Sequence, residues 1–134
     1  MAEERIVVDT DVLIEAFERG KKGLIFWLAS RDTYISYVSL YEYLWGFARI
    51  GGDVDAEKEA LEKVVKVVYP TQELLLKAMR IDVDLAARGE KVPQADILVA
   101  ATALTLRAPL ATRNRRHFER MTRYGLRLEE PPHV

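Results

Sequence analysis

The stretch that decides the fold is Ile6-Val7-Val8-Asp9-Thr10-Asp11-Val12-Leu13. Its first three residues are apolar and β-branched, which is typical of a short strand that is buried on both faces. After the polar residues, apolar side chains recur at helical spacing as far as Phe17, and Gly20 ends the pattern. We therefore predict a strand that leads directly into a helix, with acidic residues at the junction.

The same alternation of short apolar strands and amphipathic helices runs through the rest of the chain. Gly51-Gly52 closes one helix, Asp53 caps the next, Thr71 begins a long helix that Gly89 ends, and Pro93 opens another. This order predicts an α/β fold, in which a central, mostly parallel sheet of about five short strands is covered by helices on both faces. The further expected strands are 33–37, 67–69, 109–111 and 126–128, and the further expected helices are 24–28, 40–48, 53–65, 71–89, 93–104 and 115–121.

Length and composition limit what the chain can be. Its 134 residues, 49% hydrophobic and 31% charged, suit one folded domain over 1–134, with 129–134 as a short tail. The formal charge of -1 excludes a global field that would attract nucleic acid or anionic lipid, so such a partner must be bound locally. The absence of cysteine rules out disulfides, thiolate zinc sites and cysteine nucleophiles. With no membrane span and no basic signal-peptide start, we expect a soluble, cytoplasmic protein with no membrane partner.

Five polar residues are expected at one edge of the predicted sheet. Asp9 and Asp11 follow the first strand, Glu42 lies early in the helix after the second strand, Asp96 lies in the first turn of a helix, and Asn114 follows the fourth strand. Ligands of open parallel sheets bind beyond the carboxyl ends of the strands, where the strand order reverses. These residues are therefore candidates for a common site.

All of these residues except Asp9 also have a purely structural interpretation. Asp11 can serve as a helix N-cap, the segment from Ser39 to Glu42 matches a capping box, and Asn114 can cap the helix 115–121. Asp96 is favoured at a helix start by the macrodipole. Asp9 ends a strand and has no cap to serve, so it is the strongest single candidate.

The carboxylates are more informative together than singly. At about 4 Å and an effective dielectric near 20, each like-charged pair costs on the order of 4 kcal/mol, so clustered carboxylates favour a bound divalent cation. An all-oxygen set of Asp9, Glu42 and Asp96 suits Mg²⁺ or Mn²⁺ rather than Zn²⁺. Mg²⁺ keeps several waters and binds phosphate oxygens, which favours chemistry on phosphate esters.

The segment from Arg107 to Arg127 is strongly basic, with seven arginines and one acidic residue. Arg113, Arg115 and Arg116 lie beside the expected site, where guanidinium groups can bind phosphates. The alternatives are a solvated helix face or a surface for an acidic protein partner. We interpret His117 as a half-exposed structural neighbour of the core.

Four blocks of the sequence together resemble the PIN-domain nucleases, in particular the VapC-like toxins. The likeness covers most of the chain, from Val7 to about Leu128. It implies a three-layer PIN-like fold and an Mg²⁺- or Mn²⁺-dependent endoribonuclease, the toxin of a type II toxin–antitoxin pair. Such proteins are commonly homodimers and are silenced by a small VapB-like antitoxin. The blocks are 6–14, 35–46, 96–103 and 110–118.

The resemblance also implies roles for individual residues. Asp9 and Asp96 correspond to the principal metal ligands, Glu42 to a third carboxylate that holds the metal or its water, and Thr112 to a polar support; with Asn114 they form the candidate catalytic set. The implied mechanism is in-line attack of a metal-bound water on an RNA phosphodiester, which leaves a 5′-phosphate.

Two positions depart from the family pattern. Many members carry an aspartate at or next to the position of Asn114. Asparagine can still coordinate through its carbonyl oxygen, but it removes one negative charge. Asp11, where relatives often carry serine or asparagine, partly restores that charge. The departure bears on whether one metal ion or two are bound.

Two other functions stay open at this point. A catalytically weak copy of the same fold would bind RNA or a protein without metal-dependent turnover. A phosphatase resembling the haloacid-dehalogenase superfamily also begins with Asp-x-Asp after a first strand, but the chain lacks the later lysine and acid pair that this chemistry needs.

The early helices are also more aromatic than a small core requires, which makes them a candidate dimer or antitoxin surface; the residues are Trp27, Tyr41, Tyr43, Trp45 and Phe47.

Overall fold

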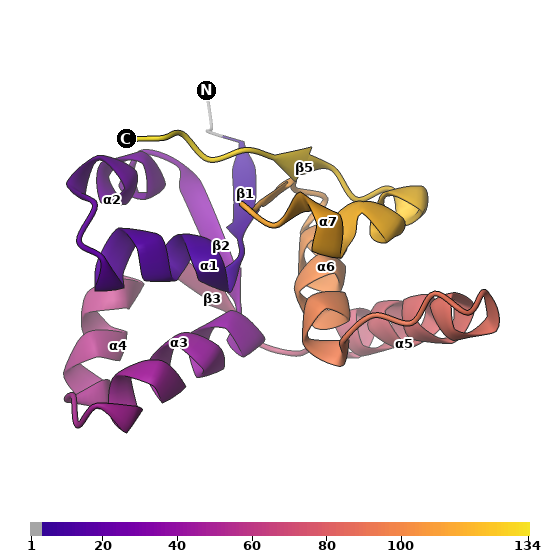
Figure 1. Cartoon of the computed structure of the whole chain (residues 1–134), viewed down its shortest axis with the longest axis horizontal. Coiled ribbons are helices and arrows are strands. Elements are labelled where there is room, and N and C mark those ends of the chain that lie inside the picture. The colour runs from indigo at the N-terminus through magenta and orange to yellow at the C-terminus, as the bar shows by residue number, and fades with distance from the viewer. Residues whose placement is uncertain (1–3) are drawn as a thin grey trace.

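A computed structural model of the chain describes residues 4–134 as a five-stranded sheet surrounded by helices (Figure 1). The strand order is β3-β2-β1-β4-β5, and all neighbouring strands are parallel. This confirms the expected α/β fold class. The elements are β1 (Arg5–Val8), α1 (Thr10–Leu13), a π-helical segment (Ile14–Glu18), α2 (Lys22–Ala29), β2 (Asp32–Ser36), α3 (Tyr37–Arg49), α4 (Val54–Glu62), β3 (Lys66–Val68), α5 (Gln72–Ala87), α6 (Gln94–Leu106), β4 (Leu110–Ala111), α7 (Arg115–Phe118), a 3-10 segment (Glu119–Tyr124) and β5 (Leu128–Glu129).

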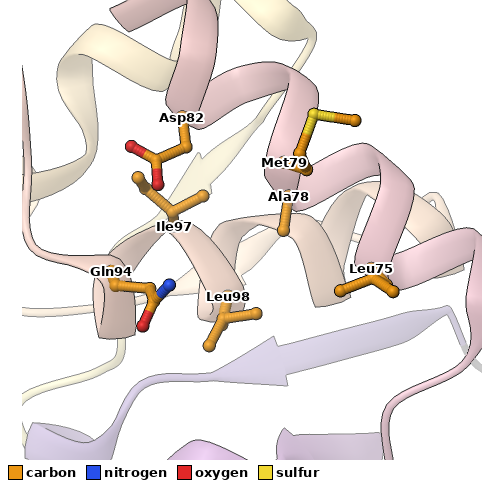
Figure 2. A pocket seen from close by; sticks show the side chains of 7 residues that line it. All are labelled: Leu75, Ala78, Met79, Asp82, Gln94, Ile97 and Leu98. Carbon is orange, nitrogen blue, oxygen red and sulfur yellow. The ribbon is translucent and has the colours of Figure 1, made fainter. Parts of the chain in front are cut away.

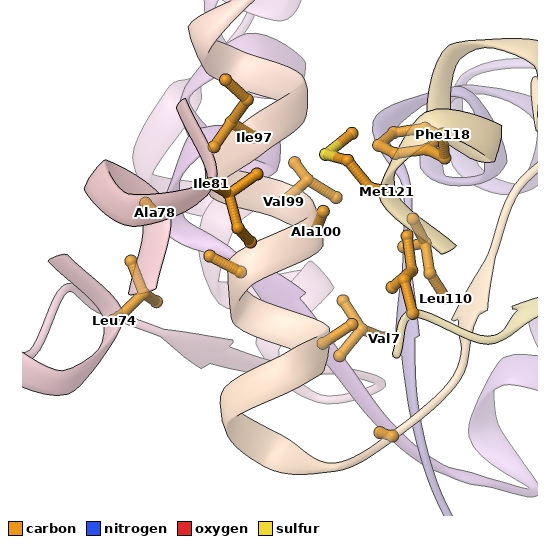
Figure 3. Close-up of a cluster of buried hydrophobic side chains, with 14 of the residues drawn as sticks. Val7, Leu74, Ala78, Ile81, Ile97, Val99, Ala100, Leu110, Phe118 and Met121 are labelled. Atoms are coloured by element: carbon orange, nitrogen blue, oxygen red, sulfur yellow. The ribbon is translucent and has the colours of Figure 1, made fainter. Parts of the chain in front are cut away.

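Side chains of β1 alternate between two hydrophobic cores, one on each face of the sheet. Ile6 and Val8 belong to the core that α1 to α4 cover. Val7 belongs to the other core, where Leu110 lies beside it, Phe118 and Met121 lie further along, and α5 and α6 complete the layer (Figure 3). The apolar run at 6–8 is therefore buried on both faces, and the three-layer architecture is confirmed.

The central helix of the second layer is α6, which contacts β1, β2, α3 and α5. Because it has neighbours on several sides, its buried residues do not form a single stripe. It packs against α5, which projects outward from the sheet (Figure 1). A shallow groove of about 240 Å³ runs between α5 and α6, lined mainly by apolar side chains such as Leu75, Met79 and Leu98 (Figure 2).

Most helix boundaries follow the signals in the sequence. Asp53 caps α4 by accepting the N–H of Ala56 at 3.1 Å, and Thr71 caps α5 by accepting the N–H of Leu74 at 3.1 Å. The first helix differs from expectation, because after α1 it continues as a π-helical segment. There the N–H of Arg19 bonds the carbonyl five residues earlier, at 3.0 Å.

The C-terminal end also differs in detail from the prediction. The last strand is 128–129 rather than 126–128, because Leu126 is buried in the core and does not pair in the sheet. Glu129, expected in the tail, belongs to this strand, and its carbonyl accepts the N–H of Thr112 at 3.2 Å. Pro131 is buried as well. Within residues 4–134, no helix combines the length and the apolar character needed to cross a membrane.

Candidate active site

The strand order reverses between β1 and β4, and the candidate site forms at this point. Asp9 follows β1, and its backbone N–H bonds the carbonyl of Ala111 at 3.0 Å. Thr112 follows β4, and its hydroxyl donates to Oδ2 of Asp9 at 3.0 Å. The same hydroxyl oxygen accepts the N–H of Asn114 at 2.9 Å. Three of the expected site residues, Asp9, Thr112 and Asn114, are thus joined by one short chain of hydrogen bonds.

Asp9 is also the N-cap of α1, so the expectation that it has no cap to serve is wrong. Its Oδ1 accepts the N–H of Thr10 at 2.8 Å. Asp11, expected at the N-cap, lies instead in the first turn, where Oδ2 accepts the backbone N–H of Arg113 at 3.1 Å. Both aspartates therefore help to fix the backbone around the site, and a carboxylate oxygen that accepts one hydrogen bond still has a lone pair for a cation.

This edge of the sheet is a poor place for two uncompensated negative charges. Burial, followed by the charge of Asp11, raises the pKa of Asp9 to about 7, although the bonds from Thr10 and Thr112 favour the ionised form. Burial likewise raises the pKa of Asp11. Within residues 4–134, Oδ1 of Asp11 is buried and has no hydrogen-bond partner. A positive charge at this position would stabilise both carboxylates.

Glu42 and Asp96 approach the same edge from two other helices. Oε1 of Glu42, on α3, accepts a hydrogen bond from the hydroxyl of Thr10 at 2.7 Å. Asp96 lies half-buried in the first turn of α6. Burial raises its pKa, the charge of His117 lowers it, and the charge of Glu42 raises it again. Asp96 is therefore within electrostatic reach of Glu42, and its Oδ2 lies 3.7 Å from Nδ1 of His117.

The chemistry of these groups fits a divalent cation, but they do not form a closed cage. In the part of the chain that the structure describes, no three Asp, Glu, His or Cys side chains lie close enough to enclose an ion. Open coordination suits Mg²⁺, which retains several waters. The partnerless oxygen of Asp11 and the raised pKa values of Asp9 and Asp96 also favour a cation here. Shared ligation by Asp9, Glu42 and Asp96 stays a prediction.

The sequence matches the family model of the PIN domain over residues 6–124. The chain belongs to the PIN-domain family. The matched range begins in β1 and ends in the 3-10 segment, so it includes the four acidic residues of the site, Asp9, Asp11, Glu42 and Asp96. The resemblance found in the four sequence blocks is thereby confirmed, and the haloacid-dehalogenase alternative is wrong.

Two relatives are similar to this PIN domain over nearly their full length. Ribonuclease VapC1 of Methanocaldococcus jannaschii is 29% identical, over 94% of this chain and 88% of the relative. A VapC ribonuclease of Pyrococcus furiosus is 31% identical, over 90% of this chain and 82% of the relative.

Solved toxin–antitoxin complexes share the fold. DNA-bound VapBC of Salmonella typhimurium matches with a TM-score of 0.82 at 22% identity, over 96% of this chain and 99% of the other. VapBC2 of Rickettsia felis, bound to a DNA fragment from its promoter, matches with a TM-score of 0.81 at 18% identity, over 94% and 98%. At these identities the likeness shows a common architecture.

Arg113 of this PIN domain is engaged by protein groups, which argues against the phosphate-binding role expected for it. Its Nε and Nη2 donate to the two carboxylate oxygens of Glu15 at 3.0 and 3.1 Å. Nη1 donates to the carbonyl of Pro131, and Nη2 to that of Pro132 at 2.7 Å. We call this group of four residues the Arg113 clamp. It ties the π-helical segment and the C-terminal residues to the loop after β4.

Two further capping expectations are wrong. Ser36, not Ser39, caps α3 by accepting the N–H of Val38 at 3.1 Å. The predicted capping box therefore does not form, and Glu42 has no capping role at the start of α3. Asn114 stands at the N-cap position of α7, but its side chain makes no capping bond. It is exposed at the surface of the site.

Sequence reasoning missed Thr10 and Glu15. The hydroxyl of Thr10 donates to Glu42, and the place of Thr10 between two aspartates was the available signal. Glu15 is only 9% exposed, in a run of otherwise apolar residues. An acidic residue on the buried side of a helix needs a cationic partner, so this position could have predicted a buried ion pair.

Proposed function

We propose that this PIN domain is a metal-dependent endoribonuclease and the toxin of a type II toxin–antitoxin pair. The observation that carries the proposal is the set of acidic side chains at the switch point, where the Thr112 hydroxyl bonds Asp9 and the Thr10 hydroxyl bonds Glu42. Burial, which raises the pKa of Asp9 to about 7, also makes this residue a functional-site candidate. The relatives named VapC ribonuclease supply the reaction class.

The proposed reaction is hydrolysis of an RNA phosphodiester. Asp9, Glu42 and Asp96 would hold Mg²⁺ or Mn²⁺, which supplies activation of water and screening of the charge that develops on the phosphoryl oxygens. Thr112 positions Asp9 through its hydroxyl, and Thr10 positions Glu42. Water attacks phosphorus, the bond to the 3′-oxygen breaks, and the products carry a 5′-phosphate and a 3′-hydroxyl.

The same proposal includes partners and location. The similar solved complexes are VapBC pairs, so we propose a small VapB-like antitoxin for this chain. The exposed aromatic side chains of α3 are candidates for that contact or for a homodimer, since Tyr41 is 70% and Trp45 56% exposed. Tyr43, by contrast, is buried and belongs to the core. Because the proposed substrate is cellular RNA, we place the protein in the cytoplasm.

The test compares RNA cleavage by the wild type, Asp96→Asn and Asp55→Asn. Asp55 is the matched control, because it is an exposed acid in the first turn of α4 and lies in no candidate site. We expect Mg²⁺-dependent cleavage that Asp96→Asn lowers at least a hundredfold, that Asp55→Asn leaves unchanged, and that EDTA abolishes. Full activity of Asp96→Asn would refute the mechanism. RNA binding without turnover would instead support the weak-copy alternative, in which Asn114 has cost the site its activity.

A further inference from the structure

A pocket beside the acidic site has the opposite charge. It has a volume of about 290 Å³ and is lined by residues of α6, α7 and their flanking segments. Asp96 forms part of its wall, so the pocket and the acidic site share one residue. The other charged groups are cations or a titratable imidazole. The full lining is Lys91, Val92, Pro93, Asp96, Arg116, His117 and Arg120.

The cations of this pocket are not neutralised by acids of the described chain. Lys91 and Arg116 make no ion pair or side-chain hydrogen bond with residues 4–134, and Arg120 donates only to the backbone carbonyl of Glu90, at 3.3 Å. The carboxylate of Glu90 is already paired with Arg123 at 2.9 Å. Asp96 lies in the wall, but its neighbour there is His117, at 3.7 Å. Cations that a fold brings together without an acidic partner are available for an anionic ligand.

Three other arginines of the basic segment differ in this respect. Arg113 is held in the clamp, Arg123 by Glu90, and Arg127 lies 3.7 Å from Glu4. Arg107 and Arg115 make no ion pair or side-chain hydrogen bond with residues 4–134 either, but they do not line this pocket, so the structure gives no support to the phosphate-binding role predicted for Arg115 here. Arg116 and Arg120 do line the pocket, and Lys91, outside the segment, joins them.

Asp96 marks the border between the two charge regions. The charge of Glu42 reaches it from the acidic side, and His117 from the basic side. A phosphodiester at the acidic site needs a cation, whereas a phosphate one step along the strand would meet Lys91 and Arg120 directly. Val92 and Pro93 provide an apolar surface on which a ribose can rest.

We propose that Lys91, Arg116 and Arg120 bind the phosphate next to the scissile one in an RNA strand. The inference rests on the proposed function. It predicts that the RNA strand runs from the acidic site past Asp96 into this pocket. These residues bind substrate and position it; they take no part in bond cleavage. Their removal should therefore raise KM and weaken RNA binding while kcat stays within about twofold.

The binding test uses a fluorescein-labelled single-stranded RNA in EDTA, where cleavage does not occur. Fluorescence anisotropy gives Kd over a range of KCl for the wild type, Lys91→Ala, Arg120→Ala and Lys63→Ala. Lys63, at the end of α4, is exposed and remote from the pocket, so it controls for the loss of one positive charge (Figure 1). We expect each pocket variant to raise Kd on the order of fivefold and to lower the slope of log K against log salt by about 0.7.

Wild-type slope and Kd in both pocket variants would overturn the inference, as would a wild type that binds no RNA at any salt concentration. Thermal melts of each variant show whether the fold is intact, and Lys91→Gln repeats the test with a side chain of similar length. Cleavage in Mg²⁺ separates the two proposals. If the wild type cleaves RNA and the pocket variants match it in KM, the inference fails and the function stands. If the wild type binds RNA but does not cleave it, the proposed nuclease activity is refuted, and the salt slopes of the variants still show whether the pocket binds phosphate.

Discussion

Glu15→Gln is the sharpest test of the Arg113 clamp. Glu15 accepts two hydrogen bonds from Arg113 and a third from Lys21 at 3.1 Å. Glutamine keeps the size of the side chain but removes its charge and replaces one acceptor with a donor. That amide would face guanidinium N–H groups that have no other acceptor at that position. The variant therefore breaks the clamp without creating a cavity.

The size of the effect follows from the burial of the two side chains. The side chain of Glu15 is 11% exposed and that of Arg113 is 18% exposed. The contribution of this ion pair to stability therefore lies between that of a surface pair, up to about 1 kcal/mol, and the cost of disrupting a buried pair, about 3–5 kcal/mol. The bonds from Arg113, the larger cause, and from Lys21 outweigh burial and lower the pKa of Glu15 from 4.5 to about 2, which corresponds to about 3 kcal/mol before any allowance for solvent. We expect Glu15→Gln to cost about 2 kcal/mol of unfolding free energy.

The assay is chemical and thermal unfolding at pH 7, with Glu62→Gln as the control. Glu62 pairs with Lys58 on α4, where both side chains are more than a third exposed, so its loss should cost under about 0.5 kcal/mol. For a chain of this size, about 2 kcal/mol corresponds to a fall in Tm on the order of 6–12 °C. Because folding lowers the pKa of Glu15, its contribution is present above pH 4.5 and is lost as the pH falls toward 2. The unfolding free energies of the wild type and of Glu15→Gln should therefore converge as the pH falls over that range.

A second variant separates the clamp from phosphate binding. If Arg113 is structural, Arg113→Gln lowers stability, because glutamine cannot make the paired charged bonds to Glu15. It then leaves the salt slope of RNA binding unchanged, although one positive charge is lost. Wild-type stability together with a slope lowered by about 0.7 would refute the clamp. That result would restore the phosphate-binding role predicted from sequence.

Three further variants test the site and the fold. In EDTA, Asp9→Asn should be more stable than the wild type by about 2 kcal/mol at pH 8, because folding raises the pKa of Asp9, so the wild type loses stability as the pH rises from about 4 through 7. Mg²⁺ should raise the Tm of the wild type but not that of the variant. Equal unfolding free energies of the two proteins at every pH would contradict this. Thr10→Val removes the hydroxyl that holds Glu42 and should lower kcat/KM by about fivefold, measured by RNA cleavage. Thr71→Ala removes the N-cap of α5 and should cost about 1 kcal/mol in urea unfolding, whereas an unchanged midpoint would mean that the cap contributes nothing.

The sheet could be predicted because its strands are short, apolar and punctuated by helices. Three successive β-branched residues at 6–8 require burial on both faces, and the two cores supply it. Details that depend on neighbours could not be read from the chain. Leu126 and Leu128 have the same local pattern, but packing buries the first in the core and the sheet pairs the second. The π-helical segment was missed because apolar spacing does not distinguish five-residue from four-residue hydrogen bonds.

The position of the candidate site was predictable from topology, whereas its hydrogen bonding was not. Parallel strands end at one edge, so Asp9 and Thr112 had to meet once β1 and β4 were neighbours. The interpretation of Asp9 failed because it treated this residue as having one role. Asp9 caps α1 and also belongs to the acidic cluster, so the cap does not count against the function.

The arginines show why net charge is a weak guide to partners in a chain of this kind. A formal charge of -1 excludes a global attraction to RNA, but it says nothing about where the fold leaves charges unpaired. Arg113 and Arg116 are three residues apart, yet one is enclosed by Glu15 and the C-terminal carbonyls and the other faces an open pocket. A nearly neutral protein can therefore bind a polyanion strongly at one place, provided that its acidic side chains are paired with cations outside that place. In this fold Glu15 and Glu90 meet that condition, because each binds an arginine that lines no part of the pocket.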